Sequence, residues 1–250
     1  MEKRKYVMSV AGFDPSGGAG LAADIKTFEA HGVNGLSVLT GNTVQTESIF
    51  YSVQWENLET ILKTIDVLIE EYPVSFVKTG IVPSFGFLNE IILHLKKNIP
   101  NVKIIVDPVI KSGTGFNFQT DESPDKLEEI LNNIFLITPN CDEAMLLTGK
   151  NDVTDAAKLL AKNCNVLLKG GHNIINPGFD YLYSEGNCIE IYPGIESVFP
   201  KHGSGCVLSA AISANLTLGE TLTKACVQAK KYTEKFLASS PTLSGHHYAE

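Results

Sequence analysis

The stretch YVMSVAGFDPSGGAGLAADIKTFEAHGVNGLSVL, residues 6–39, combines a strand pattern, a glycine-rich turn, a helical pattern and a second strand pattern. The apolar run at 6–11 predicts a strand, residues 20–31 predict a helix, and residues 35–39 predict another strand. Two strands joined through a helix form a βαβ unit, whose strands lie parallel in one sheet. This stretch therefore predicts an α/β fold.

The rest of the chain repeats the alternation. Further strands are predicted at 49–55, 74–79, 103–107, 135–138 and 165–169, with a hairpin formed by 180–183 and 189–192. Helices are predicted at 57–71, 84–97, 124–132, 142–147, 154–163, 203–216 and 221–237. Such a chain forms a mostly parallel sheet with helices on both faces. Residues 49–55 alternate in polarity and predict a small edge flap.

The organisation predicts one domain over residues 1–250, because no internal repeat or long linker interrupts the pattern. The tail at 239–250, which contains His246 and His247, is expected to fray and to hold no ligand. Ligands bind at the carboxyl ends of strands in open parallel sheets. The loops that follow the predicted strands are therefore where a functional site is expected.

Composition excludes several classes of protein. The 250 residues carry a formal net charge of −8, a pI near 5.3 and no basic stripe, so a nucleic-acid partner is not expected. No apolar run approaches the roughly 18 residues of a membrane span, and no export signal is present, so no membrane partner is expected. Five cysteines without a CxxC pair fit free thiols in a reducing cytoplasm.

Residues 201–206, KHGSGC, lead directly into an apolar helix. Glycines at a helix start leave backbone N–H groups accessible, and the helix dipole adds partial positive charge, so this end can bind phosphate. Cys206 in the first turn is expected to have a lowered pKa and thiolate character, and could accept a proton from a substrate hydroxyl. On this motif alone, a glycine cap followed by a buried structural cysteine is the more common arrangement.

The loop at 12–20, GFDPSGGAG, precedes Asp24 by one helical turn. Its glycines allow close approach of a ligand, although tight strand–helix packing needs glycines too. The loop does not match GxGxxG, so a dinucleotide site is not supported, and the sequence contains no GxxxxGK[ST] P-loop.

Three further residues follow strands in the second half of the chain. Asp107 and Glu143 suit the oxygen shell of Mg²⁺, which keeps water and phosphate ligands. Asn140 with Glu143 equally fits a helix capping box. Lys169, beside Gly170 and Gly171, could meet phosphate as a point charge or could be a solvated lysine. His172 and His202 have no metal-pair or triad spacing and are expected to orient or support neighbouring groups.

Together these loops predict a site that binds a phosphate-rich ligand with Mg²⁺ and removes a proton from a small hydroxyl compound. Phosphoryl transfer fits this combination, because its transition state needs positioning and charge stabilisation more than covalent chemistry.

Five motifs then show a resemblance. They are VAGFDPSGGAGLAADIKTFEAHGVNGLSVLT near the start, DPV at 107–109, ITPNCDEAMLLTG at 137–149, LLKGGH at 167–172 and HGSGCVLSAAISANLTLG at 202–219. In this order, over essentially the whole chain, they resemble the hydroxymethylpyrimidine/phosphomethylpyrimidine kinases of thiamine biosynthesis, in the ribokinase-like superfamily. The resemblance implies a three-layer α/β/α sandwich, the cofactors ATP and Mg²⁺, a cytoplasmic homodimer, and phosphorylation of a pyrimidine alcohol or its monophosphate.

The resemblance also implies roles for the matching residues. Cys206 takes the catalytic position, and an anion hole surrounds the transferred phosphoryl group, formed by Gly203, Ser204 and Gly205. The pyrimidine is expected to contact four residues: Gly12, Asp24, Gln45 and Val109. A glutamine amide donates and accepts hydrogen bonds, which suits an aminopyrimidine edge. Lys169 is expected to contact the ATP phosphates, while Asp107 and Glu143 organise Mg²⁺, partly through water.

The sequence departs from the family pattern at three places. Ile110 runs directly into Lys111-Ser112-Gly113, Pro200-Lys201-His202 stands where Asn-Thr-His is usual, and residues 43–46, TVQT, lack the usual Gln-Asn pair. These departures keep a vitamin B6 kinase open as an alternative. A non-catalytic sensor of the pyrimidine is a third interpretation, which the intact catalytic motifs oppose.

Overall fold

The computed structural model describes residues 4–110, 124–171, 177–195 and 197–248. In these residues nine strands form one sheet, in the order β3-β2-β1-β4-β5-β6-β7-β8-β9. The strands are β1 (Tyr6–Phe13), β2 (Asn34–Gln45), β3 (Phe50–Trp55), β4 (Val74–Thr79), β5 (Lys103–Val106), β6 (Leu136–Ile137), β7 (Asn165–Leu168), β8 (Asp180–Ser184) and β9 (Asn187–Ile191). Strands β2, β1 and β4 to β7 pair in parallel, which confirms the predicted architecture.

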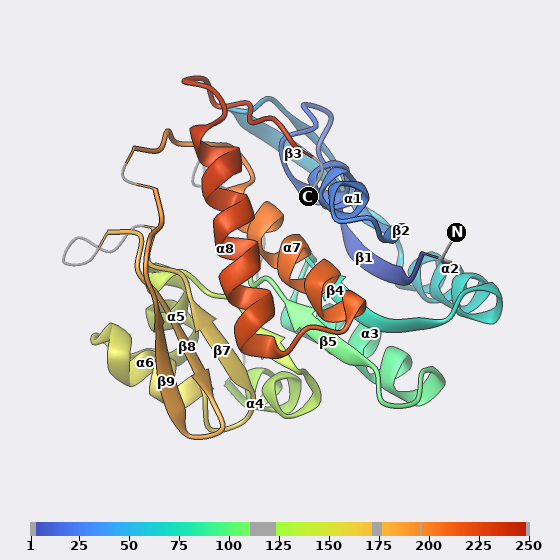
Figure 1. The fold of residues 1–250 in the computed structure, drawn as a ribbon. Helices are drawn as coiled ribbons and strands as arrows, with labels where there is room; N and C mark the ends of the chain where they lie inside the picture. The colour runs from blue at the N-terminus through green and yellow to red at the C-terminus, as the bar shows by residue number, and fades with distance from the viewer. Residues whose placement is uncertain (1–3, 111–123, 172–176, 196, 249–250) are drawn as a thin grey trace.

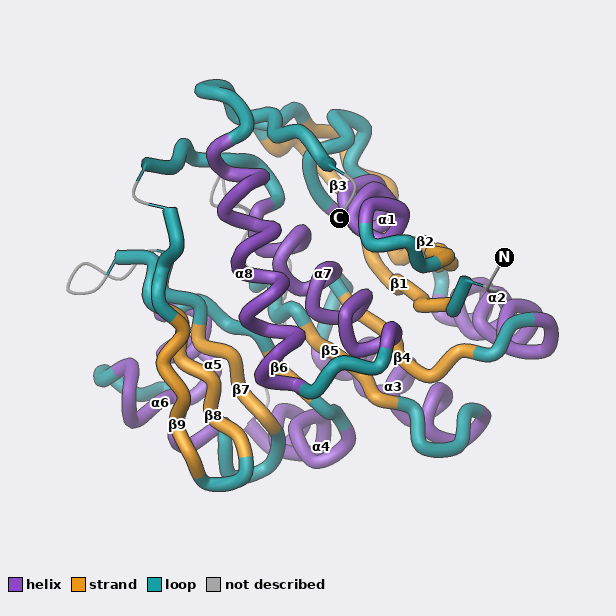
Figure 2. Tube along the Cα trace, in the orientation of Figure 1, coloured by secondary structure: helices purple, strands orange, loops and turns teal. Residues whose placement is uncertain are grey.

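The described helices cover both faces of the sheet (Figure 1). They are α1 (Gly20–Ala30), α2 (Leu58–Glu71), α3 (Phe85–Asn98), α4 (Pro124–Asn133), α5 (Cys141–Thr148), α6 (Val153–Leu160), α7 (Ser204–Leu218) and α8 (Leu222–Ala238). Helices α2 to α6 pack in one apolar cluster, and α1, α7 and α8 pack on the opposite face. Figure 2 shows the resulting layers: helices, sheet and helices.

Successive strand residues supply the two clusters in turn, as the pleat of a strand requires. Ile104 packs with α2 to α6, whereas Ile105 packs with α7 and α8. Helix α7 is buried on all sides, from Val207 to Thr217, because it lies between the sheet and its neighbours α1 and α8. This burial fixes the N-terminus of α7 at the carboxyl edge of the sheet.

The predicted edge flap is present, but β2 is longer than expected. Residues 40–45 were expected to form a loop, whereas they continue β2 and pair antiparallel with β3 from Gly41–Trp55 to Gln45–Phe50. The extension arises because β3 supplies hydrogen-bond partners for backbone that would otherwise be exposed. The hairpin β8–β9 is also present, and Glu185 and Gly186 have positive φ at its turn, as a two-residue type I′ turn requires.

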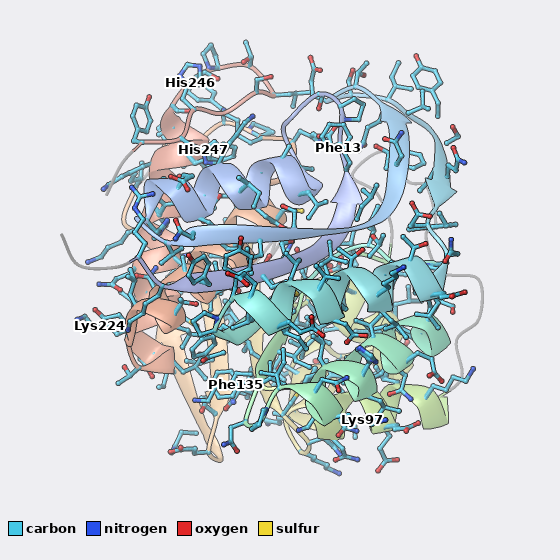
Figure 3. The ribbon with its side chains drawn as sticks, turned by 90° about the vertical axis from the view of Figure 1, so that its right-hand side faces the viewer. Phe13, Lys97, Phe135, Lys224, His246 and His247 are labelled. Atoms are coloured by element: carbon cyan, nitrogen blue, oxygen red, sulfur yellow. The ribbon has the colours of Figure 1, made fainter. Side chains whose placement is uncertain are left out.

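The described part of the tail is docked, so the expectation that it frays is wrong for residues 239–248. Leu243 accepts a hydrogen bond from the His202 backbone at 3.0 Å, and the ring of His247 lies 4.9 Å from that of Phe236. The sequence pattern missed this packing because it depends on contacts with α8. In Figure 3, His247 and Phe13 lie toward one end of the molecule, and Phe135 toward the other. No helix in the described residues has the length and apolarity to cross a membrane.

Candidate active site

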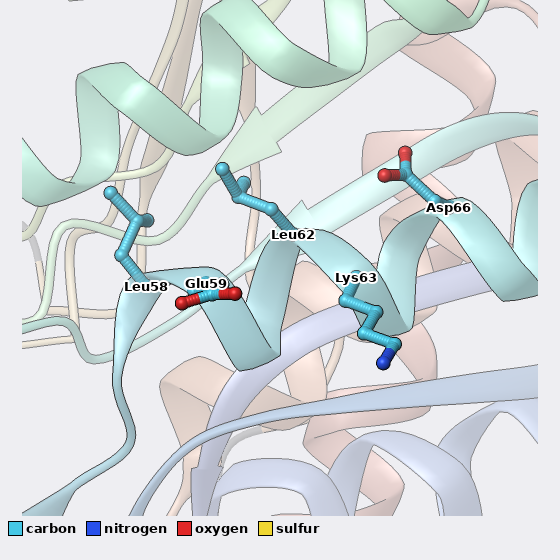
Figure 4. Close-up of a pocket in the computed structure, with 5 residues that line it drawn as sticks. All are labelled: Leu58, Glu59, Leu62, Lys63 and Asp66. Atoms are coloured by element: carbon cyan, nitrogen blue, oxygen red, sulfur yellow. The ribbon is translucent and has the colours of Figure 1, made fainter.

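A cavity of about 1720 Å³ runs along the carboxyl ends of the strands. It is lined by most of the residues that the sequence singles out: Gly12, Gln45, Asp107, Val109, Glu143, Lys169, Gly203, Ser204, Gly205 and Cys206. These residues come from loops far apart in the chain, and the parallel sheet gathers them at one edge. A second pocket is shallow, lies on α2 alone and includes none of them (Figure 4).

The N-terminus of α7 opens into this cavity. Gly203 caps the helix with φ 75°, a left-handed conformation that favours glycine. A side chain there would also place its Cβ 2.0 Å from the carbonyl oxygen of Gly18, so the two glycine-rich loops touch. A Cβ at Gly205 would lie 3.3 Å from Lys169 Nζ. The small residues therefore let a helix terminus, a lysine and the first glycine loop approach one another.

Cys206 lines the cavity in the first turn of α7. Burial first, and then the nearby carboxylates of Asp107 and Asp24, raise the pKa of its thiol to about 11, although Lys78 and the Gly20 backbone act in the opposite direction. The expectation of a thiolate is therefore wrong for the ligand-free chain, because loss of solvation outweighs the helix terminus. The Cys206 side chain still lines the cavity beside the predicted phosphoryl site, and the residue as a whole keeps some exposure.

Asp14 holds the first glycine loop to the start of α7. Its carboxylate accepts hydrogen bonds from the backbone N–H groups of Ser16, Gly18 and Ala19, and lies 3.0 Å from His202 Nε2. Burial would raise the pKa of Asp14, but the hydrogen bonds from His202, Ser16 and Ala19 lower it to about 2. The expected supporting role of His202 agrees with this contact. The role of Asp14 was not predicted, although an aspartate two residues before serine in a turn is a familiar signal.

Asp24 lies beneath the cavity and does not line it. Its side chain is fully buried, and it accepts hydrogen bonds from Lys78 Nζ at 2.8 and 2.9 Å and from Ser9 Oγ at 2.5 Å. The predicted direct contact between Asp24 and a pyrimidine is therefore corrected: Asp24 holds Lys78, which does line the cavity. Burial would lower the pKa of Lys78, but the interactions with Asp24, Cys206 and Asp107 together outweigh burial and raise it.

Lys78 is a site residue that the sequence did not reveal. It stands at the end of the apolar run VSFVKT in β4, and its charged partner is 54 residues away. A lysine in an otherwise apolar strand, just before a strand end, was the available signal.

Asp107, Glu143 and Lys169 form one group. Lys169 Nζ lies 3.0 Å from Asp107 Oδ1 and 3.7 Å from Glu143 Oε2. Burial opposes the charge on Asp107, but Lys169 and Lys78 outweigh it and lower the pKa of Asp107. Glu143 also completes the capping box of α5, because it accepts from the Asn140 backbone while Asn140 accepts from its own. The capping prediction is thus confirmed, and Lys169 is paired rather than solvated.

The group is compatible with a Mg²⁺ ion that binds mainly to water and substrate phosphates and takes only one or two ligands from the protein. The oxygens of Asp107 already accept hydrogen bonds from Lys169, Thr138 and Ser209. Within the described residues no cluster of three or more His, Cys, Asp or Glu side chains could hold a metal ion. Magnesium commonly uses only one or two carboxylates, with water and substrate phosphates completing its shell. Asp107 and Glu143 fit that limited role.

Gly12 on β1 and Gln45 on β2 lie toward the β2 end of the cavity, and Val109 lines it from the segment that follows β5 in the middle of the sheet. Gln45 Nε2 donates to Thr43 Oγ1 at 2.9 Å, which orients the amide. A Cβ at Gly12 would meet Ile81 Cδ1 at 2.4 Å and the Gly41 carbonyl oxygen at 3.3 Å, so a larger residue there would displace the Ile81 side chain. Lys111-Ser112-Gly113 and His172 lie outside the described residues.

Comparison with known proteins places this site in context. A family model described as phosphomethylpyrimidine kinase matches residues 14–249. The chain is 34% identical to a hydroxymethylpyrimidine/phosphomethylpyrimidine kinase of Aquifex aeolicus, over 94% of this chain and 95% of that protein. Three longer relatives from Saccharomyces cerevisiae are 30 to 32% identical, and the chain spans about half of their length, 45 to 46%.

Solved structures share the fold. The crystal structure of a phosphomethylpyrimidine kinase from Clostridium difficile has a TM-score of 0.77 and 33% identity, covering 92% of this chain and 98% of that one. An ADP complex of Bacillus subtilis pyridoxal kinase has a TM-score of 0.83 and 26% identity, covering 99% and 98%. Both pyrimidine and vitamin B6 kinases therefore share the architecture of this chain.

Proposed function

From the premise that the chain belongs to the phosphomethylpyrimidine kinase family, we propose that it transfers the terminal phosphoryl group of ATP to the hydroxymethyl group of 4-amino-5-hydroxymethyl-2-methylpyrimidine. The monophosphate of this alcohol is a second candidate substrate, and residues 1–250 form one kinase domain. The observation that carries the proposal is the single cavity that brings Cys206, the N-terminus of α7 and Lys169 together with Gln45.

The phosphoryl group is transferred at the start of α7. The hydroxymethyl oxygen attacks the terminal phosphorus, the bond from that phosphorus to the bridging oxygen of ADP breaks, and the hydroxyl proton passes to Cys206 Sγ. Backbone N–H groups at Gly203, Ser204 and Gly205 stabilise the charge on the transferred group, since a helix N-terminus favours anions. Lys169 contacts the ATP phosphates as a point charge.

Cys206 must be a thiolate to accept this proton, whereas its pKa of about 11 makes the thiol dominant in the ligand-free chain. Lys78 favours the thiolate, while Asp107 opposes it. Asp107 and Glu143 would hold Mg²⁺, which when bound offsets phosphate charge and the charge of these carboxylates. Cys206 is therefore expected to act as a base only in the ternary complex.

The pyrimidine occupies the β2 end of the cavity. Gln45 presents an amide that can donate to one ring atom and accept from the amino group. Val109 packs on the ring, and Gly12 leaves space for its edge. Asp24 contributes through Lys78 rather than through a contact of its own, because it is fully buried.

Phosphorylation of a B6 vitamer is the second candidate function. The observation that favours it is the structural similarity to the ADP complex of Bacillus subtilis pyridoxal kinase, which covers 99% of this chain. Measuring ADP release with the pyrimidine alcohol, its monophosphate, pyridoxal and pyridoxine separates the two. The proposal expects the highest kcat/KM for the pyrimidine alcohol. A higher value for a B6 vitamer would support the alternative, and pyrimidine binding without ADP release would indicate a sensor.

A cytoplasmic homodimer belongs to the same proposal. All five cysteines are free, which suits a reducing compartment. The edge flap exposes apolar side chains, Val44 and Tyr51 among them, that a second copy could cover. Light scattering of the purified chain tests the dimer, and a mass of one chain would contradict it.

A further inference from the structure

A buried ion cluster lies at the opposite end of the cavity from Gln45. We call Asp180, Lys230 and Glu234 the Lys230 cluster. Lys230 Nζ lies 2.9 Å from Asp180 Oδ2 and 3.7 Å from Glu234 Oε1, and all three side chains are at most 9% exposed. Lys230 also donates to the carbonyl oxygen of Gly178. Burying three charged side chains costs free energy of desolvation unless their partners are well placed. The cluster therefore restricts the positions of the backbone groups that it contacts.

The two carboxylates hold backbone from two loops. Asp180 Oδ1 accepts from the Gly170 N–H at 2.8 Å, in the loop that follows β7. Both oxygens of Glu234 accept from the Gly194 N–H, at 3.0 and 3.1 Å, in the segment that follows β9. Lys230 and Glu234 belong to α8, so the cluster ties that helix to the loops at this end of the sheet.

These loops form the cavity wall beyond Lys169. Gly170 directly follows Lys169, and a Cβ at Gly170 would lie 1.6 Å from the Phe179 carbonyl oxygen, so the backbone at Gly170 packs closely against Phe179. The sheet order places β2, which carries Gln45, near one edge and β8 and β9 at the other. The cavity lining near the cluster is largely apolar: Pro177, Pro193, Ile195, Val198 and Leu237.

The proposed reaction indicates which part of ATP would lie at the β8–β9 end of the cavity. With the pyrimidine at Gln45 and the transferred phosphoryl group between Lys169 and α7, the remainder of ATP extends toward β8 and β9. Apolar walls with a few placed polar groups suit a nucleobase and its ribose.

We propose that Lys230 is a positioning residue for the nucleotide: by neutralising Asp180 and Glu234, it holds the backbone at Gly170 and Gly194 in the geometry that binds the nucleoside part of ATP. This inference rests on the proposed kinase function. A merely structural cluster would change the stability of the chain, or both Michaelis constants together. A positioning role would instead raise the Michaelis constant for ATP alone.

The test measures the Michaelis constants of Lys230→Met for ATP and for the pyrimidine alcohol. We expect KM for ATP to rise roughly 10- to 100-fold, as loss of hydrogen bonds to a charged group predicts, while KM for the alcohol stays within about twofold. Lys224→Met is the matched control, because Lys224 lies on the same helix with a side chain 58% exposed and paired only with Glu220 among the described contacts. The control should change neither constant.

Glu234→Gln provides a second variant should Lys230→Met not fold, because it removes charge while keeping size. It should raise KM for ATP in the same direction by a smaller factor, and titration calorimetry with ADP should show the same loss of affinity. Equal rises in both Michaelis constants, or an unchanged KM for ATP in a folded variant, would overturn the inference. Absence of turnover in the unaltered chain would instead overturn the kinase function.

Discussion

Lys78 Nζ lies 2.8 Å from Asp24 Oδ2, and neither side chain is exposed to solvent. The pair joins β4 to α1 directly below the cavity that Lys78 lines. It therefore supplies a fixed positive charge near Cys206 while Asp24 stays out of reach of a substrate. Removing either partner should leave the other buried without compensation.

Asp24→Asn should lower the free energy of unfolding by about 3–5 kcal/mol, because Lys78 is then a buried cation without its counter-ion. Urea unfolding followed by circular dichroism measures this loss. Glu29→Gln is a suitable control on the same helix, since Glu29 forms an exposed pair with Arg4. The control should change stability by less than about 1 kcal/mol. Equal small effects in the two variants would contradict a stabilising role for the pair.

Asp14 should give the stability of the chain a specific dependence on acid pH. Its pKa is lowered from 3.8 to about 2 in the folded chain, so the unfolded chain binds the proton first as pH falls. The stability contributed by Asp14 is thus complete above pH 3.8 and is lost as pH falls toward 2. Chemical unfolding at several pH values should show the difference between the unaltered chain and Asp14→Asn shrinking over this interval. A constant difference would show that Asp14 does not titrate as described.

Gln45→Ala should reduce kcat/KM for the pyrimidine alcohol by roughly 10- to 100-fold, because a buried polar edge of the substrate loses its partner. Any residual turnover of pyridoxal should change much less. Steady-state ADP release with each substrate measures both values. An equal loss for the two substrates would show that Gln45 supports the flap rather than recognising the ring.

The Cys206 thiol should react slowly with iodoacetamide in the ligand-free chain. With a pKa of about 11, its thiolate fraction, and hence its rate, should rise about tenfold per pH unit between pH 7.5 and 9.5. Peptide mass spectrometry follows Cys206 separately, and exposed Cys188 provides an accessible reference in the same sample. A Cys206 rate that stays constant across this pH range would show that the side chain is already a thiolate, as expected from the sequence.

The sequence predicted the parts of the site that local patterns and sheet topology determine. Residues 6–39 indicated a parallel sheet, and that topology brings Asp107, Lys169 and Gly203 to one edge. What it could not predict depends on burial and distant partners. The high pKa of Cys206 follows from desolvation, and the position of Asp24 from its pairing with Lys78 in another strand.

The same limit applies to two differences in the fold. Residues 40–45 continue β2 because β3 lies beside them, and residues 239–248 are docked on the rest of the fold, where His247 packs on Phe236. Neither contact leaves a pattern in the local sequence. Both features depend on contacts between two neighbouring segments, β2 with β3 and the tail with α8, which the pattern of each segment alone does not show.

In the proposed mechanism the proton of the substrate hydroxyl passes to Cys206 at the N-terminus of α7. Measuring kcat for ADP release with the pyrimidine alcohol in Cys206→Ala tests this transfer, with unchanged thermal unfolding confirming the fold. We expect kcat to fall by about 10²- to 10⁴-fold, as for loss of a general base, with KM for ATP little changed. A folded Cys206→Ala variant that turns over at the rate of the unaltered chain would contradict this transfer.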